Sequence, residues 1–593
     1  MRHRLFAATL AALTLALGAP AVATSARAVD ARDLFGMQYV PKFDVLHGVG
    51  SWQGSRTRGI AFHRDLGVEV SREGFIWRVY EAGGPGDTRN RADFDDAIDR
   101  LANAGIAVEA MVTDEPLWAS SAPHPDPRKA ESYEFAPPKG LNAPIFADGT
   151  DVPGANKAVN PANTWAAMLD RTVRRYRGRV RYWQVWNEPD YPKGDTRASY
   201  ADPRRSWNGS VADYVRLLRV AHVIVKRADP QAFVVTGGLG FPTYLDAMLR
   251  DGAGAYFDAL DFHAYGWPGS EAAIAKFRDV HDALAAVLTK HGLDKPMLCS
   301  ETGYSADEPQ SQAAYIAKLY PTALALGVRS CMYYANTNPS WKNMGLIDWH
   351  TMSQKTLGYW AYKNAHAAMA GVRTIAPIGQ SGLEGYRFMR ADGELAVVWS
   401  AKPHTIRWSF GDRPWQVRDD VGRLLGRHTG AAAIAVGPHP LWLDTNLGRD
   451  YVALQPNPRL HYDGLPFAKA IADSTSPNSA GPEAAIDTDT DTHWANEAYE
   501  RPEAWLSVAL THGEELHSLK VKTGPTPPGT WFDVEISDDG THYETVATHE
   551  VLHGWGLEPI TLAHPVRTRY IRLHWHNPDR KPASFTVYEV EAD

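Results

Sequence analysis

Two glutamates in this sequence each follow an apolar, strand-like run of residues. Glu188 lies in the motif WNEP and Glu301 lies in the motif SETG. Two carboxyl groups that face each other can serve as proton donor and nucleophile, which is the chemistry that cleavage of a glycosidic bond requires. A single glutamate at a strand end is usually only solvated. Two of them in such motifs favour a catalytic pair.

Strand-like and helix-like segments alternate from residue 33 to about residue 365. Residues 93–105 carry apolar side chains at spacings of three and four and end at a glycine, which is typical of an amphipathic helix. The apolar pattern of residues 106–113 then predicts a buried strand. Repetition of this pattern predicts an α/β domain, specifically a (β/α)8 TIM barrel. Active sites of such barrels lie at the C-terminal strand ends, where Glu188 and Glu301 would meet.

The remainder of the chain predicts two β domains. Short strands separated by turn pairs such as Asp392-Gly393 occupy residues 366–453 and indicate a small β-sandwich. Residues 454–464 have the composition of a linker. Residues 465–593 are again rich in alternating strand patterns.

The first residues have the features of a secretory signal peptide, which we expect to span residues 1–28. Arg2 and Arg4 precede an apolar run at 5–17, and A-x-A cleavage motifs end at Ala23 and Ala28. We therefore expect a secreted, periplasmic or extracellular protein. No later segment reaches the roughly 20 apolar residues of a transmembrane helix, so no membrane span is expected.

The amino-acid composition limits which kinds of molecule the protein is expected to bind. Lys and Arg total 61 and Asp and Glu total 69, which gives a net charge of −8, and no basic run interrupts this balance. A nucleic-acid partner is therefore not expected. The 20 Trp and 25 Tyr fit either large cores or contact with sugar rings. Cys299 and Cys331 lie in strand-like runs and are either disulfide-bonded or buried free thiols.

Residues 33–365 resemble the retaining glycoside hydrolases of clan A, most of all glycoside hydrolase family 39. The run YRGRVRYWQVWNEPD at 176–190 is similar to the fourth-strand signature, and CSETGYS is similar to the seventh-strand segment. The resemblance implies that Glu188 is the acid/base, Glu301 the nucleophile and Asn187 a ligand of the substrate 2-hydroxyl. It also implies a carbohydrate substrate with β-type linkages and no cofactor or metal for catalysis.

Two further segments extend this resemblance. FHAYG matches the sixth-strand end and implies that His263 and Tyr265 flank the nucleophile. SREGFIW implies that Arg72 lies beneath the carboxylates. Aromatic residues near other strand ends are candidates for contact with sugar or, alternatively, for packing over the barrel rim: Trp77, Trp118 and Trp341.

The last domain resembles discoidin-like domains (coagulation factor type C), which include carbohydrate-binding module family 32. The segments AAIDTDTDTHWA, WFDVEISDDGTHY, RYIRLHW and FTVYEVEAD carry this resemblance. It implies a β jelly roll and a structural Ca²⁺ bound by Asp487, Asp489 and Glu589. Thr488 stands where relatives usually have glycine. The alternative is that these acids are solvated turn residues.

Other features of the sequence suggest three competing hypotheses. Residues 549–553 spell H-E-x-x-H, but a zinc protease needs this motif on a helix, and alternating strands surround it. The glycine cluster at 234–243 suggests a dinucleotide loop, but Pro242 breaks that pattern. A non-catalytic glycan-binding or adhesion protein on a glycosidase scaffold is the third, and an intact Glu188 and Glu301 pair argues against it.

Overall fold

The structure is a computed structural model of the chain. It describes residues 27–29, 31–38, 52–191, 194, 196–197, 205–266, 269–304, 309–334, 344–346, 356–449, 451, 465, 467–476, 479–487, 493–496, 503–524, 530–550, 557–577 and 585–593.

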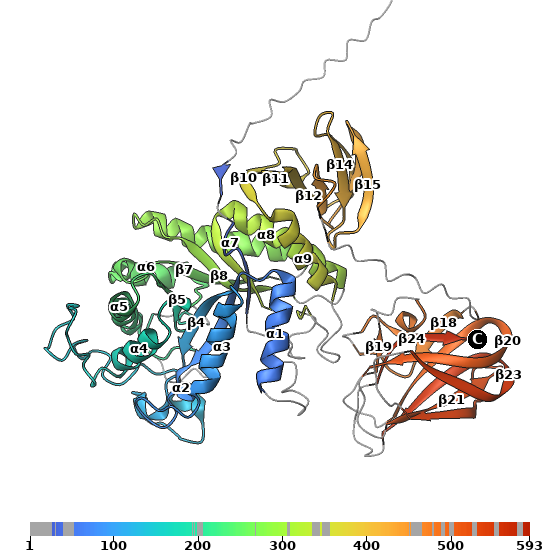
Figure 1. Cartoon of the computed structure of the whole chain (residues 1–593), viewed down its shortest axis with the longest axis horizontal. Coiled ribbons are helices and arrows are strands. Elements are labelled where there is room, and N and C mark those ends of the chain that lie inside the picture. The colour runs from blue at the N-terminus through green and yellow to red at the C-terminus, as the bar shows by residue number, and fades with distance from the viewer. Residues whose placement is uncertain are drawn as a thin grey trace, which may run out of the picture.

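Eight parallel strands form the first domain and confirm the predicted barrel (Figure 1). The strands are β2 (Phe35–Gln38), β3 (Val70–Ile76), β4 (Ala107–Thr113), β5 (Val180–Val185), β6 (Phe233–Val235), β7 (Leu260–Tyr265), β8 (Met297–Gly303) and β9 (Val328–Tyr333). Their order is β6-β5-β4-β3-β2-β9-β8-β7. Parallel bridges from Val235 to Ala259 and from Leu239 to Phe262 link the two end strands, so the barrel is nearly closed.

Helices surround these strands. They are α1 (Trp52–Leu66), the short α2 (Trp77–Tyr80), α3 (Arg91–Asn103), α4 (Thr164–Arg175), α5 (Val211–Ala228), α6 (Pro242–Arg250), α7 (Gly269–Lys290), α8 (Pro309–Leu326) and α9 (Leu357–Met369). α5 begins with a capping box in which Ser210 and Asp213 bond each other's backbone N–H groups. None of the helices in the described ranges is long and apolar enough to cross a membrane.

A β-sandwich follows the barrel. Its larger sheet has the order β1-β10-β11-β12-β17-β14-β15, and its smaller sheet pairs β13 with β16. The strands are β1 (Arg27–Ala28), β10 (Val372–Pro377), β11 (Glu384–Arg390), β12 (Gly393–Trp399), β13 (His404–Trp408), β14 (Pro414–Arg418), β15 (Leu424–Thr429), β16 (Ala432–Val436) and β17 (Leu441–Asp444). Leu395, Val397 and Trp399 join the barrel core, whereas Ala396 and Val398 join the sandwich core. This alternation of side chains along β12 buries both faces of the sheet.

The last domain is an antiparallel sheet structure with its own core. Its elements are β18 (Phe467–Ala472), η5 (Pro482–Ala485), β19 (Trp494–Ala495), β20 (Glu503–Thr523), β21 (Trp531–Ser537), β22 (Glu544–Glu550), β23 (Leu557–His576) and β24 (Thr586–Ala592). His549 and Glu550 of the H-E-x-x-H motif lie in β22. A strand cannot turn both histidines of this motif toward one metal as a helix does, so the protease hypothesis fails on the described part of the motif.

The two cysteines lie opposite each other on adjacent barrel strands. Cys299 of β8 is in register with Cys331 of β9. Both are buried free thiols, and burial raises the pKa of Cys299 well above its usual range. Of the two alternatives left open by the sequence, the structure has the unpaired one.

Candidate active site

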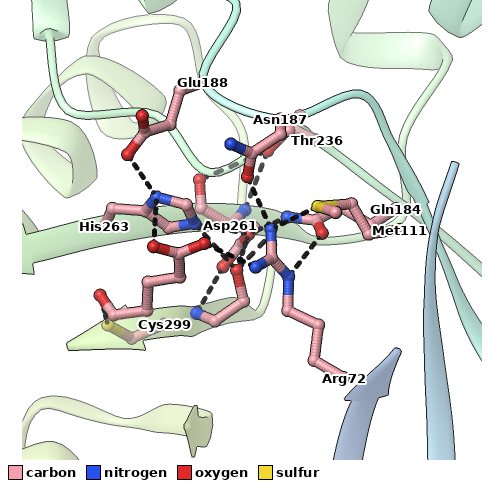
Figure 2. Close-up of polar contacts among 12 residues, drawn as sticks. Arg72, Met111, Gln184, Asn187, Glu188, Thr236, Asp261, His263 and Cys299 are labelled. Carbon is pink, nitrogen blue, oxygen red and sulfur yellow. Dashed lines mark hydrogen bonds and ion pairs between the residues drawn. The ribbon is translucent and has the colours of Figure 1, made fainter. Parts of the chain in front are cut away.

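Glu188 and Glu301 meet at the C-terminal ends of barrel strands. Glu188 follows β5, the fourth strand of the barrel, and Glu301 lies in β8, the seventh. His263 Nδ1 lies 2.7 Å from Glu188 Oε1 and 3.7 Å from Glu301 Oε2. One oxygen of each glutamate and one ring nitrogen of His263 all lie within 4.8 Å of one another. Figure 2 shows Glu188 above the imidazole of His263. The tertiary structure therefore brings together the two carboxyls that the motifs singled out.

A strained turn positions Glu188. Trp186 and Glu188 have φ values of 75° and 45°, in the left-handed region that non-glycine residues rarely adopt. The Trp186 N–H donates to Val112 O at 2.9 Å, and the Glu188 N–H donates to Gly237 O at 2.5 Å. Asp190 accepts bonds of 2.8 Å from the N–H groups of residues 240 and 241. Contacts on both sides thus hold a backbone conformation that would otherwise relax.

Positive and hydrogen-bonding groups surround Glu301. Arg72 Nη1 donates to Glu301 Oε1 at 2.6 Å, and the Tyr265 hydroxyl donates to Oε2 at 2.9 Å. Gln38 Nε2 also donates to Oε1, at 3.2 Å. Burial alone would raise the pKa of Glu301, but the charges of His263 and Arg72 and the Tyr265 bond outweigh it and lower the pKa. The Glu301 carboxyl is therefore an ionised group, suited to nucleophilic attack.

Arg72 connects the nucleophile to the other strand ends. Its guanidinium is fully buried. Besides Glu301, it donates from Nη2 to Asn187 Oδ1 and from Nε to Gln184 Oε1, both at 2.7 Å (Figure 2). Arg72 thereby holds the Asn187 side chain next to Glu188. The structure places Arg72, Tyr265, His263 and Asn187 around the two glutamates.

Ser300 and Asp261 orient His263, and neither was among the candidate residues. The hydroxyl of Ser300 donates to Asp261 Oδ2, and the Ser300 N–H donates to Asp261 Oδ1 at 2.8 Å. Because the single hydroxyl hydrogen of Ser300 is used on Asp261, its oxygen must accept from His263 Nε2, which lies 3.0 Å away. Nε2 therefore carries a hydrogen. Nδ1, the nitrogen that faces Glu188, is the one whose protonation can change.

The charges around His263 determine its protonation. Burial alone would lower the pKa of His263, but the charge of Glu301, the Glu188 contact and the charge of Asp261 together raise it to about 9. At neutral pH the imidazole is consequently a cation between carboxyls. The hydrogen in the Nδ1 contact can pass to Glu188 Oε1 without any movement of heavy atoms.

Asp261→Asn is expected to lower kcat about tenfold, or ~1.4 kcal/mol of barrier, and to shift the basic limb of the pH–rate profile to lower pH. Loss of the Asp261 charge removes one cause of the raised pKa of His263, so the imidazole loses its proton at a lower pH. The pH–rate profile measures this shift. Ser300→Ala is the matched control, because it keeps the charge and should leave the basic limb nearly in place. An unchanged limb in Asp261→Asn would show a merely structural role.

A second buried acid lies beneath the site. Glu109 of β4 has Oε1 3.7 Å from Arg72 Nε, with both side chains fully buried. Burial and the charge of Asp261 raise the pKa of Glu109 to about 8. At neutral pH Glu109 is a neutral carboxyl, so it does not compete with Glu301 for the positive charge of Arg72. A charged residue type in the apolar run of residues 106–113 is the signal that could have drawn attention to Glu109.

The glycine cluster after β6 has a role in this site. Gly238 has a φ of 67°, and a Cβ at this position would lie 2.2 Å from His263 Nε2. Only glycine leaves room there for the imidazole. The pattern that suggested a dinucleotide loop thus accommodates His263.

The predicted aromatic contacts have different outcomes. Trp77 is fully buried, and its indole N–H donates to Glu81 at 3.2 Å, so it has no surface to offer a sugar. This corrects the expectation for Trp77, whose side chain packs edge-on against Trp118. Trp118 is half-buried and donates to the Glu81 carbonyl at 2.8 Å. Trp341 lies outside the described residues.

The calcium candidates lie in two elements of the last domain. Asp487 is exposed just after η5, whereas Glu589 is buried in β24, and η5 packs against β24. Asp489 lies outside the described residues. Two carboxylates on adjoining elements are donors that fit Ca²⁺.

Comparisons with known proteins found one matching family model and several similar solved structures. The F5/8 type C domain family matches residues 469–587, which confirms the discoidin-like domain. None of the curated proteins matches the chain. Its fold is similar to that of a family 39 glycoside hydrolase from Bacteroides cellulosilyticus WH2 (17% identity, 70% of this chain and 82% of that chain, TM-score 0.49).

Two other solved structures are also similar. One is a glucosidase from Croceicoccus marinus, with 14% identity over 70% of this chain and 95% of that chain and a TM-score of 0.48. The other is a chitosan-binding module from Paenibacillus sp. IK-5, with 22% identity over 21% of this chain and 93% of that chain and a TM-score of 0.19. At these identities and TM-scores, the site geometry has to carry the functional assignment.

Proposed function

We propose that this protein is a retaining glycoside hydrolase that cleaves β-type glycosidic bonds in a polysaccharide or glycan. The observation that carries the proposal is the approach of Glu188 and Glu301, which have one oxygen each within 4.8 Å of the other. Retaining enzymes hold their carboxyls about 5–5.5 Å apart, whereas inverting enzymes leave about 6.5–9.5 Å for a water. The contacts of Arg72 and Tyr265 with Glu301 support its role as the nucleophile.

The reaction would proceed in two displacements. The Glu301 carboxylate attacks the anomeric carbon and forms an ester as the glycosidic C–O bond breaks, and Glu188 gives its proton to the leaving oxygen. The Glu188 carboxylate then takes a proton from water. The oxygen of that water bonds to the anomeric carbon, and Glu301 leaves as a carboxylate. Asn187, held by Arg72, would bind the 2-hydroxyl. None of these steps requires a cofactor.

His263 supports both steps through one contact. Its Nδ1 hydrogen can move onto Glu188 before the first displacement, when Glu188 must act as an acid. Formation of the ester removes the charge of Glu301, which is the largest of the interactions that raise the pKa of His263. When the second displacement begins, Glu301 carries no charge, so the electrostatic field at His263 and Glu188 differs from the field at the start of the first displacement.

A panel of aryl β-glycosides and of plant and bacterial polysaccharides tests the proposal. Turnover by the full chain with retained anomeric configuration supports it, and the substrate that reacts identifies the sugar. Products released as monomers or as oligomers distinguish exo from endo action. A non-catalytic glycan-binding protein is the alternative. It predicts no turnover with any substrate, although the chain still binds glycan.

We further propose that the F5/8 type C domain binds carbohydrate next to the barrel and holds a structural Ca²⁺. The carboxylate oxygens of Asp487 and Glu589 would bind the ion. The ion would then link η5 to β24, which are in contact. The barrel of the same chain, for which we propose glycosidase activity, supports a glycan as the ligand of this domain.

We also propose export, with the leader removed after Ala23 rather than after Ala28, the boundary expected from the sequence. Arg27 and Ala28 form strand β1 against Ile375 and Thr374, and Arg27 donates to the carbonyls of Leu324 and Ala325 at 2.7 and 2.6 Å. Cleavage after Ala28 would remove all of these bonds.

The mature protein is expected to begin at Thr24, which the intact mass of the protein from the medium of an exporting host would show. A mature chain that begins at Val29 would contradict this cleavage site.

A further inference from the structure

The outward face of the last domain carries a cluster of histidines and acids on three adjacent strands. β23 pairs with β20 on one side and with β21 on the other. His574 and His576 are separated by one residue, so both point away from the core, while Trp575 between them is buried in it. Glu503 of β20 lies directly opposite His576.

These three side chains turn their ligand atoms toward a common point. Glu503 Oε2 lies 3.9 Å from His574 Nε2, and Glu503 Oε1 lies 3.9 Å from His576 Nδ1. The three ligand atoms that they offer all lie within 4.8 Å of one another. Two nitrogens bound at 2.0–2.1 Å to a tetrahedral ion are roughly 3.3 Å apart, so a small closure of the side chains would complete the coordination.

The other nitrogen of each imidazole is bound to a carboxylate of β21. His576 Nε2 lies 3.0 Å from Asp533 Oδ2, and His574 Nδ1 lies 3.4 Å from Glu535 Oε1. Histidines that bind metals almost always donate their second N–H to a carboxylate or carbonyl, which fixes the ring and increases its basicity. Both histidines show this pattern, and in both the free nitrogen faces Glu503.

Neighbouring groups hold the rings and leave one side open. Trp531 stacks on His576 with ring centroids 5.4 Å apart and an angle of 22°. Arg572, a cation on the same face, pairs with Glu535 and lies over the Tyr543 ring at 3.8 Å. The Glu503 side chain is 61% exposed, so solvent or another ligand can reach the site.

We propose that Glu503, His574 and His576 bind one divalent transition-metal ion, with Zn²⁺ as the best match. Two imidazole nitrogens and one carboxylate favour Zn²⁺ over Ca²⁺, which prefers oxygen ligands. Three protein ligands leave a fourth position open. The site is separate in residues and in chemistry from the calcium candidates Asp487 and Glu589.

Zinc titration of the metal-free full chain by calorimetry tests this site. We expect one ion per chain, together with a rise in Tm on addition of Zn²⁺ because the ion binds the folded state. The double variant His574→Gln, His576→Gln should lose at least about 100-fold in affinity and the rise in Tm. Asp533→Asn should weaken binding roughly 10- to 100-fold through His576.

Two controls make the result decisive. His542→Gln changes a highly exposed histidine of the same domain and should bind Zn²⁺ as the wild type does. Glycosidase activity of the double variant should equal that of the wild type, since its residues lie outside the barrel. Equal zinc affinity in the double variant and the wild type would overturn the proposal. Inhibition of hydrolysis by the same zinc would then place the ion at Glu188, His263 and Glu301 instead.

Discussion

Glu301→Gln is expected to reduce kcat on an aryl β-glycoside by roughly 10⁴-fold or more, the scale seen when an enzyme loses its nucleophile. The amide keeps the shape of the side chain but cannot form the glycosyl ester. It also removes the charge that raises the pKa of His263, so this pKa should fall below about 9. Steady-state kinetics measure the first effect, and NMR titration of the histidine ring measures the second.

The control for this variant is Glu384→Gln, a partly exposed glutamate of the sandwich that pairs with Arg278. Its kcat should stay within twofold of the wild type. Glu301→Gln should also keep its affinity for the substrate, because Arg72 and Asn187 remain in place. A variant with near-normal turnover would remove Glu301 from the nucleophile position and with it the double-displacement mechanism.

Glu188→Gln is expected to lower kcat/KM by about 10²- to 10⁴-fold on natural glycans, which is the usual contribution of general acid catalysis. Substrates with an acidic phenol as leaving group should lose much less, because such a group departs without protonation. The glycosyl-enzyme should then accumulate, since no base activates the water. Glutamine keeps a polar contact with His263 Nδ1, which lies 2.7 Å from the carboxyl in the wild type.

Azide distinguishes this role from loss of fold. It attacks the glycosyl-enzyme without a general base, so it should restore turnover of the activated substrate in Glu188→Gln and give a β-glycosyl azide. The β configuration would also support retention. Equal losses on natural and activated substrates, with no response to azide, would contradict the acid/base role of Glu188.

The sequence was most informative where a chemically active residue directly follows a clear strand pattern. WNEP and SETG each end an apolar strand, so the positions of Glu188 and Glu301 follow from the barrel topology. The arrangement of Arg72, His263 and Tyr265 around them agrees with the resemblance. Trp77 shows the limit of this reasoning, because an aromatic residue at a strand end can face either the sugar or the core. Only packing against Trp118 and Glu81 shows which of the two is realised.

Which nitrogen of His263 changes its protonation could not be predicted from local sequence. It depends on a hydrogen bond from Ser300 to Asp261, on two strands that are adjacent only in the folded barrel. The zinc candidate is a similar case. The pattern His-x-His in β23 is visible in the sequence as two side chains on one face. Glu503 and Asp533, however, lie 71 and 41 positions before His574.

From sequence alone the barrel, the two β domains and the positions of Glu188 and Glu301 at strand ends could be predicted, because hydrophobic periodicity and short motifs are local properties of the chain. Only the tertiary structure shows which polar groups form hydrogen bonds and which charges shift the pKa values of their neighbours. The pKa of His263 is raised to about 9 by groups on several strands, and the chain brings them within a few ångströms only when the barrel closes. Electrostatic interactions depend on distance and burial, and these exist only in the folded state.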